Sequence, residues 1–382
     1  MIENLLDNDM YKFTMMQLVY HHFPTAHVKY RFKCRNQIDL LLIRKEISRD
    51  IDKICKMEFQ KKQIDFLRSQ DFIKQDFADF LENFRLKREY VHVEERNQKL
   101  DIWIEGPFIQ TILFEVPILK IVHENYSIMN NPLTTNLLVE GAKRLKEKIE
   151  LIKTCKETEE IVISDFGTRR AYSGDWHNFV IEEMLSHHVI DGTSNLNHAM
   201  KYQIPAVGTM AHEIIQAGQS LAPNVVDSQR FILQKWQEEY KGKLAIALSD
   251  TLGMEKFLKD FDIHFAKAYD GVRHDSGDPF AWLEKMISHY QKLDIDSTTK
   301  KVVFSDGLDV PTAIALNRKC LGRIQCSFGI GTNLTNDLGV TPLQNVIKMI
   351  ECNGLAVAKI SDNPEKTMCE NREYMEYLKS MI

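Results

Sequence analysis

Apolar and polar residues alternate between His27 and Arg35. Val28, Tyr30, Phe32 and Cys34 share one face of such a segment, and four basic residues share the other. Strict alternation is typical of a strand with one buried face, so the sequence predicts a strand here.

Two further strands are predicted nearby, from Tyr90 to Val93 and from Leu100 to Ile104. The polar segment 94–99 joins them, which is typical of a hairpin. Between the first strand and this hairpin, in residues 38–88, apolar residues recur at helical spacing among many charges. The first part of the chain, residues 1–125, is therefore predicted to mix antiparallel strands and helices.

The pattern changes between about residues 126 and 345. Short apolar runs each end in a polar or glycine-rich turn, and stretches able to form helices, such as 211–219 and 311–317, lie between most of them. The repeated order strand, loop, helix is typical of βα units that build a parallel sheet. The strands are predicted at residues 161–163, 189–190, 204–207, 244–248, 302–304 and 324–328.

This number of βα units favours a closed α/β barrel over a doubly wound open sheet. In a barrel the chemistry lies at the carboxyl ends of the strands, where these polar turns fall. The third part, residues 346–382, has one strand-like run at 355–360 and a charged helical tail. We expect this segment to pack back on the first part of the chain.

The length of 382 residues suggests two or three domains. A composition of 44% hydrophobic and 27% charged residues excludes a mostly disordered chain. The formal net charge of −5 is not that of a nucleic-acid-binding module, although a local basic patch could still bind phosphates.

No membrane association is expected, because the most apolar long stretch, residues 108–122, is interrupted by polar side chains and is too short to span a bilayer. Residues 1–9 lack the pattern of a signal peptide. The seven cysteines are scattered and form no CxxC pair, which predicts reduced thiols and a cytoplasmic protein.

Several familiar motifs are absent from the sequence. It has no GxxxxGK[ST] phosphate loop, no GxGxxG opening a βα unit, and no cysteine and histidine spacing typical of zinc. ATP would therefore not be bound by a P-loop.

The segment 327–332 and the turn 305–307 resemble phosphate-binding loops, because glycine lets backbone N–H groups approach an anion. The alternative is a pair of tight turns that need glycine for steric reasons. The segment 273–279 packs a base, two carboxylates and a hydroxyl closely together; it could bind a ribose diol or hydrated Mg²⁺, or it could simply cap the helix predicted at Pro279.

Two more segments allow both a functional and a structural interpretation. Phe166, Arg169 and Arg170 follow a predicted strand, where arginines could bind carboxylate or phosphate and the aromatic ring could stack on a flat ligand. They could equally be a core phenylalanine beside solvated arginines. His212 could be a nucleophile or base, but it is one of 13 histidines, and the pattern alone favours a structural role.

Taken together, these segments resemble the nicotinate phosphoribosyltransferase family over nearly the whole chain, and they occur in the family's order. The segments are LDNDMYK (6–12), DFGTRR (165–170), GTSN (192–195), GTMAHE (208–213), RHDSGDP (273–279), FSDGLD (304–309) and SFGIGT (327–332).

The resemblance implies a type II phosphoribosyltransferase fold of the α/β class. This fold is an irregular α/β barrel with an additional α+β domain formed by the N-terminal part and the C-terminal tail. The implied reaction joins nicotinate to 5-phosphoribosyl 1-diphosphate, giving nicotinate mononucleotide and diphosphate, as the first step of NAD salvage from nicotinate. It uses Mg²⁺ and is coupled to ATP hydrolysis.

The resemblance also implies roles for single residues. Phe166 would stack on the pyridine ring, and Tyr11 of a partner subunit in a homodimer would cover its other face. Arg169 and Arg273 would bind the nicotinate carboxylate and the phosphates. Asp250 and Asp275 would lie near the ribose, and His212 would be the autophosphorylated histidine. The residues implied at the 5′-phosphate are Gly307, Gly329, Gly331 and Thr332.

Ser194 bears on the choice of substrate. Relatives that use nicotinamide carry an acid at this position, whereas a serine hydroxyl can donate to a carboxylate, so we expect nicotinate to be preferred. The alternatives are a related enzyme that uses nicotinamide or quinolinate, and a phosphohistidine-bearing carrier with an inactive barrel.

Overall fold

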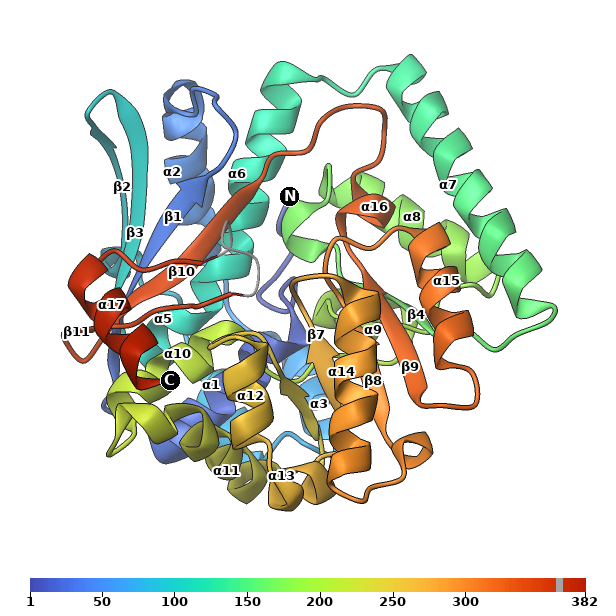
Figure 1. Cartoon of the computed structure of the whole chain (residues 1–382). Coiled ribbons are helices and arrows are strands. Elements are labelled where there is room, and N and C mark those ends of the chain that lie inside the picture. The colour runs from blue at the N-terminus through green and yellow to red at the C-terminus, as the bar shows by residue number, and fades with distance from the viewer. Residues whose placement is uncertain (362–366) are drawn as a thin grey trace.

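The structure, a computed structural model, describes residues 1–361 and 367–382. Two sheets organise this part of the chain (Figure 1). One is antiparallel, with the strand order β11-β10-β1-β3-β2. Its strands are β1 (His27–Cys34), β2 (Val91–Arg96), β3 (Lys99–Pro107), β10 (Asn345–Cys352) and β11 (Leu355–Ala356).

The second sheet is parallel, with the strand order β5-β4-β9-β8-β7-β6. Its strands are β4 (Ile163–Asp165), β5 (Gly192–Thr193), β6 (Ile246–Leu248), β7 (Gly271–His274), β8 (Lys301–Phe304) and β9 (Gln325–Ile330). The mixed α/β class predicted from the sequence is confirmed.

Helices surround and connect the two sheets (Figure 1). In the first part of the chain they are α1 (Met10–His22), α2 (Arg44–Ile54), α3 (Lys61–Ser69), α4 (Gln75–Glu82), α5 (Phe108–Thr111), α6 (Glu115–Asn130) and α7 (Thr135–Lys156). Those that follow are α8 (Gly174–Ser186), α9 (Leu196–Tyr202), α10 (His212–Leu221), α11 (Ser228–Tyr240), α12 (Met254–Asp260), α13 (Ile263–Ala268), α14 (Pro279–Lys292), α15 (Val310–Cys320), α16 (Thr332–Thr335) and α17 (Arg372–Met381).

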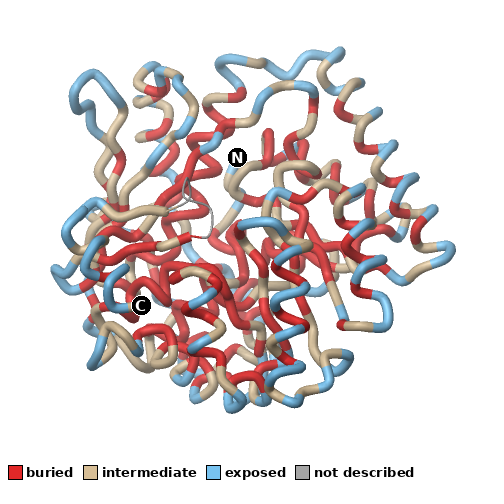
Figure 2. Tube along the Cα trace, in the orientation of Figure 1, coloured by how far each residue is buried: buried red, intermediate tan, exposed pale blue. Residues whose placement is uncertain are grey.

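The N-terminal part and the C-terminal segment share the antiparallel sheet, because β10 pairs with β1 from Val28↔Cys352 to Cys34↔Asn345. The predicted hairpin is confirmed as β2 and β3, and its polar tip is exposed while the centres of both sheets are buried (Figure 2).

A buried polar network joins helices α1, α6 and α10 to strand β1 of the antiparallel sheet. Lys12 of α1 forms ion pairs with Glu115 and, at 2.5 Å, with Glu213 of α10. The Tyr30 hydroxyl of β1 donates to Glu213 at 2.8 Å. Buried charges persist only where they are paired, so this network fixes how α1, α6 and α10 meet.

Three sequence predictions about strands are corrected. Residues 189–190 are not a strand, because Val189 N donates to Met184 O and thus still belongs to the turn that ends α8; the strand is Gly192–Thr193. Residues 204–207 form only an isolated bridge at Ala206, beside Pro205, which has no N–H to donate to a ladder. The run 355–360 is a strand only at Leu355–Ala356.

Among the described residues, no helix combines the length and the apolar character needed to cross a bilayer. The β7 strand was not predicted, because its short sequence ends in the polar residues Arg273 and His274.

Candidate active site

A cavity of about 470 Å³ lies at the carboxyl ends of the parallel strands. The loops that follow parallel strands converge at one edge of the sheet. Thus Phe166 follows β4, Ser194 follows β5 and Asp275 follows β7. The predicted site residues that line the cavity are Tyr11, Phe166, Arg169, Ser194, His212, Arg273, Asp275, Gly307, Gly331 and Thr332.

The antiparallel sheet contributes another wall of the cavity. Arg35 directly follows β1, and Lys348 lies on β10. Tyr11, on α1, lines the cavity of its own chain. The structure thus brings Tyr11 to the cavity within a single chain, and a contribution of Tyr11 from a partner subunit stays a prediction. The start of α1 is fixed within the chain, where Met10 N donates to Ser194 O at 2.7 Å.

His212 begins α10 and carries its imidazole to the cavity wall. Its Nε2 lies 2.7 Å from Asp250 Oδ1 and 3.5 Å from Asp275 Oδ2. Asp250 does not line the cavity; its other oxygen lies 2.9 Å from the buried Lys359 Nζ. Asp250 is thus placed behind His212, so the structure does not bring it to the cavity wall beside Asp275.

Burial lowers the pKa of His212 to about 4, although Asp250 and Asp275 favour its charged form. Burial would also raise the pKa of Asp250, but His212 and Lys359 hold it well below its usual range. At neutral pH the pair is therefore a neutral imidazole and a carboxylate. Nε2 must carry the proton that Asp250 accepts, so Nδ1 has a free lone pair.

Glu213 is not the carboxylate that orients His212. Adjacent residues of a helix point in different directions, and Glu213 pairs with Lys12 and Tyr30 instead. Sequence reasoning named the histidine by resemblance, but its carboxylate partner is supplied by a residue far away in the chain.

Positive charge gathers in the cavity. Its basic residues are Arg35, Arg169, Arg170, Arg273, Lys348 and Lys359. Burial together with the like charges of Arg169 and Arg35 lowers the pKa of Arg170 to about 10, and burial beside Lys359 lowers the pKa of Lys348 to about 7. Crowded cations of this kind are stabilised when an anion enters, so the cavity suits phosphates and carboxylates.

Gly329 lies within β9 and is absent from the cavity lining, so the structure does not bring it together with Gly307, Gly331 and Thr332. A Cβ at Gly329 would stand 2.3 Å from Phe166 Cδ2, and one at Gly331 would stand 2.8 Å from Phe166 O. The first glycine thus makes room for the phenylalanine ring. Gly331 makes room for the backbone of the same residue and still lines the cavity.

The Ser194 hydroxyl, which was expected to donate to the nicotinate carboxylate, has a hydrogen-bond acceptor within the protein. It donates to Asp9 Oδ1 at 2.7 Å, so its proton is not available to a nicotinate carboxylate. Burial raises the pKa of Asp9, whose side chain also lines the cavity. Position 194 therefore faces an existing carboxylate of the protein, a neighbour that the sequence did not reveal.

The segment 273–279 caps a helix and also reaches the cavity. Asp278 accepts from Ala281 N at 2.7 Å and caps α14. Arg273 and Asp275 line the cavity, with Arg273 Nη2 at 3.9 Å from Asp275 Oδ2. Ser305 Oγ donates to Asp275 Oδ1 at 3.0 Å, which links the loops after β7 and β8.

Four cavity residues were not predicted from the sequence: Asp9, Arg35, Lys348 and Lys359. Two signals were present in the sequence: Lys348 interrupts the apolar run of β10, and Arg35 directly follows the alternating strand β1. A lone charge in a strand can also face solvent, so only the pairing of β1 with β10 reveals that these cations meet.

The chain matches two family models. The nicotinate phosphoribosyltransferase N-terminal domain matches residues 6–123, and the nicotinate phosphoribosyltransferase family model matches residues 161–381. The nicotinate phosphoribosyltransferase of Ralstonia nicotianae is 49% identical over 387 aligned residues, which cover 100% of this chain and 99% of that protein. The one from Cupriavidus necator is 49% identical over 386 aligned residues, covering 100% and 98%.

A solved structure agrees with these relatives. The crystal structure of nicotinate phosphoribosyltransferase from Vibrio cholerae superposes with a TM-score of 0.95 at 38% sequence identity. The superposition covers 100% of this chain and 93% of that chain.

Proposed function

The chain belongs to the nicotinate phosphoribosyltransferase family and transfers a phosphoribosyl group to nicotinate, and from this premise we propose that the cavity binds both substrates and that His212 couples the transfer to ATP. One observation carries the proposal: a buried neutral imidazole, oriented by Asp250, faces a cavity rich in cations.

Nicotinate binds between Phe166 and Tyr11, with its carboxylate at Arg169. Arg169 Nη1 lies 3.6 Å from Glu115 Oε1, an ion pair loose enough to leave the guanidinium able to bind a second anion. The pyridine nitrogen already carries a lone pair, so it attacks without a general base. The protein's task is to hold the ring in place and exclude water.

5-Phosphoribosyl 1-diphosphate occupies the rest of the cavity. Gly307, Gly331 and Thr332 bind the 5′-phosphate, and the φ of +57° at Gly307 suits glycine. Arg273 binds the diphosphate, and Asp275 lies near the ribose. As the C1–O bond breaks, positive charge develops on the ribose and negative charge on the diphosphate, and the fixed charges of the cavity stabilise both.

Mg²⁺ fits this cavity because Asp275 and Asp306 both line it, and carboxylate oxygens are ligands that Mg²⁺ accepts. These two residues would hold it. When bound with the diphosphate, the ion would offset the charge of the leaving group.

ATP acts through His212. The Nδ1 lone pair attacks the γ-phosphorus, the bond to the β-phosphate oxygen breaks, and ADP leaves, while Asp250 stabilises the proton on Nε2. The phosphohistidine adds negative charge and acceptor oxygens to the cavity wall. Water later hydrolyses it to inorganic phosphate, so the free energy of ATP hydrolysis can favour product formation.

Purified protein tests the proposal with 5-phosphoribosyl 1-diphosphate, Mg²⁺ and either nicotinate, nicotinamide or quinolinate, each with and without ATP. Nicotinate mononucleotide formed faster with ATP, with phosphate found on His212 by mass spectrometry, is the expected result. Phosphate on His212 without any nucleotide product would instead support the carrier alternative. Nicotinate turnover that ATP does not change would refute the coupling.

The parallel sheet is proposed to close as an irregular barrel. Its ladders make β5 and β6 the edges, yet Thr193 of β5 bridges to Ala206, and Thr209 Oγ1 donates to Ile246 O of β6 at 2.9 Å. Residues 206–209 thus span the distance between the two edges. On this basis residues 126–345 form the barrel domain, and residues 1–125 with 346–382 form the α+β domain.

The assembly and the compartment are also proposals. A homodimer follows from the family resemblance, although Tyr11 does not require one. All seven cysteines are free thiols, which supports action in the cytoplasm.

A further inference from the structure

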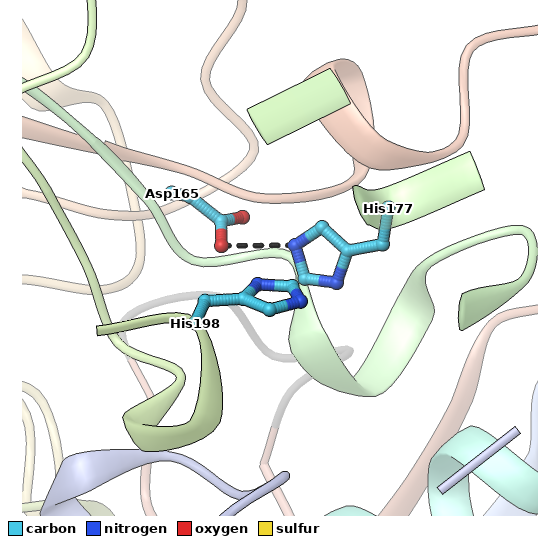
Figure 3. Close-up of side chains that lie close together, drawn as sticks. All are labelled: Asp165, His177 and His198. Atoms are coloured by element: carbon cyan, nitrogen blue, oxygen red, sulfur yellow. Dashed lines mark hydrogen bonds and ion pairs between the residues drawn. The ribbon is translucent and has the colours of Figure 1, made fainter. Parts of the chain in front are cut away.

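Behind the Phe166 loop, three buried side chains from three segments meet: Asp165 at the end of β4, His177 in α8 and His198 in α9 (Figure 3). His177 Nε2 lies 2.9 Å from Asp165 Oδ2. The two imidazole rings pack edge to face, with centroids 4.3 Å apart and planes 77° apart.

Asp165 connects two walls of the cavity. Its Oδ1 accepts from Gly167 N at 2.8 Å, in the loop that carries Phe166 and Arg169. Its Oδ2 accepts from Thr193 Oγ1 at 2.8 Å, directly before Ser194. The backbone adds a third link, because Ser194 N donates to Asp165 O at 2.8 Å. A shift of this carboxylate therefore moves both walls.

We propose that His177 and His198 are positioning residues that hold Asp165, and thereby set the geometry with which the Phe166 and Ser194 loops bind nicotinate. His177 supplies the donor that fixes Asp165 Oδ2. His198 supplies a rigid flat surface against the His177 ring, and its own Nε2 donates to Asn178 Oδ1 at 3.1 Å. The inference rests on the proposed contact of Phe166 with the pyridine ring.

The protonation states of Asp165 and His198 fit their separate tasks, since one accepts hydrogen bonds and the other packs against His177. Burial would raise the pKa of Asp165, but His177 and the other donors hold it at about 2, so it accepts as a carboxylate. Burial and the nearby His177 lower the pKa of His198 to about 3, so this ring is neutral. Within the described residues, Nδ1 of His198 has no hydrogen-bond partner, so its contribution is the shape and orientation of the ring.

A metal ion is the less favoured occupant of this cluster. The three residues offer ligand atoms within 4.8 Å of one another. However, Asp165 already accepts three hydrogen bonds, from Gly167, His177 and Thr193, which use most of the lone pairs of its carboxylate.

The test compares His177→Gln, which keeps an N–H donor, with His177→Leu, which does not. We expect His177→Leu to raise the KM for nicotinate about tenfold while the KM for 5-phosphoribosyl 1-diphosphate stays within about twofold, and His177→Gln to recover most of the loss. The second pair is His198→Phe, which keeps a flat ring, and His198→Ala. Only His198→Ala is expected to raise the KM for nicotinate.

Three outcomes would overturn the positioning role. They are an unchanged KM for nicotinate in folded His177→Leu, an equal rise in both KM values, and a tightly bound metal ion lost from His177→Leu in elemental analysis. If His177→Leu fails to fold, the two His198 variants decide. Phe166→Ala is measured in parallel: if it leaves the KM for nicotinate unchanged, the proposed stacking fails rather than the positioning role.

Discussion

Two histidine–aspartate pairs flank the same cavity and differ in use. His212 lies 2.7 Å from Asp250, and His177 lies 2.9 Å from Asp165; all four side chains are buried. Only the His212 ring lines the cavity. The two pairs therefore show that a histidine–aspartate hydrogen bond does not by itself define the role of the histidine. That role depends on whether the second nitrogen of the imidazole can reach a substrate.

The two carboxylates, Asp250 and Asp165, also differ in their surroundings. Asp250 has a cation behind it, Lys359, which stabilises its charge beside the imidazole of His212. Asp165 instead accepts from Gly167 and Thr193, which fix backbone loops. One pair is suited to energy coupling and the other to recognition of the base.

Substitution of His212 is expected to have the largest effect of the changes considered for the two pairs. His212→Asn should remove both the phosphohistidine and the stimulation by ATP, a loss of about 5- to 150-fold if the coupling has the usual size. His177→Gln is the matched control, because it changes a buried histidine yet should keep the phosphate on His212. Mass spectrometry and initial rates with and without ATP measure both; a phosphorylated His212→Asn protein would contradict the assignment.

Gly329→Ala tests the Phe166 loop, which is proposed to bind nicotinate, by disturbing the packing of the Phe166 ring. The added methyl would meet the Phe166 ring, and overpacking of this kind costs about 1–3 kcal/mol of stability. We expect a lower Tm and a raised KM for nicotinate, while ATP still phosphorylates His212. Gly322→Ala is the control, because its Cβ meets nothing within 4 Å and only its φ of +68° is strained. That variant should lose about 1 kcal/mol without a change in KM.

Ser194→Asp adds negative charge beside the proposed nicotinate site and leaves the His212–Asp250 pair unchanged. A second carboxylate beside Asp9 should weaken binding of the nicotinate anion by about tenfold, or about 1.4 kcal/mol. Ser194→Asn, which is neutral, should retain more of the parent affinity. Competition between nicotinate and nicotinamide measures the preference, and a parental preference in Ser194→Asp would count against this account.

The smallest expected effect is a change in the pH dependence of the ATP-stimulated rate, caused by a change in the pKa of His212. The charge of Lys359 disfavours protonated His212, so Lys359→Met should raise the pKa of His212 from about 4 by up to about one unit. The protonated ring cannot attack ATP, so the acid limb of ATP-stimulated kcat should move to higher pH. Lys348→Met removes another cavity cation that does not contact Asp250; an equal shift in that control would show a general charge effect.

The sequence predicted the secondary-structure classes well where a pattern extends over many residues. The alternation of His27–Arg35 and the hairpin both appear as strands. Short elements were less predictable: β5 is only Gly192–Thr193, whose position depends on its neighbours β4 and Ala206 rather than on its own side chains. Local pattern cannot encode such a strand.

The site was predicted where chemistry follows a strand directly, as at Phe166 and Asp275. It was not predictable where two distant segments meet. Asp250 and Lys359 become partners of His212 only through the fold, and Gly329 was assigned to a phosphate because a glycine that makes room for Phe166 looks the same in sequence.

The pairing of β1 with β10 has a consequence for synthesis of the protein. Arg35 leaves the ribosome early, but the strand that carries Lys348 emerges only after nearly all of the parallel sheet. Contacts between such distant segments form late, because a long loop must close first. The cation-rich cavity therefore lacks the wall that carries Lys348 until the last part of the chain has been synthesised.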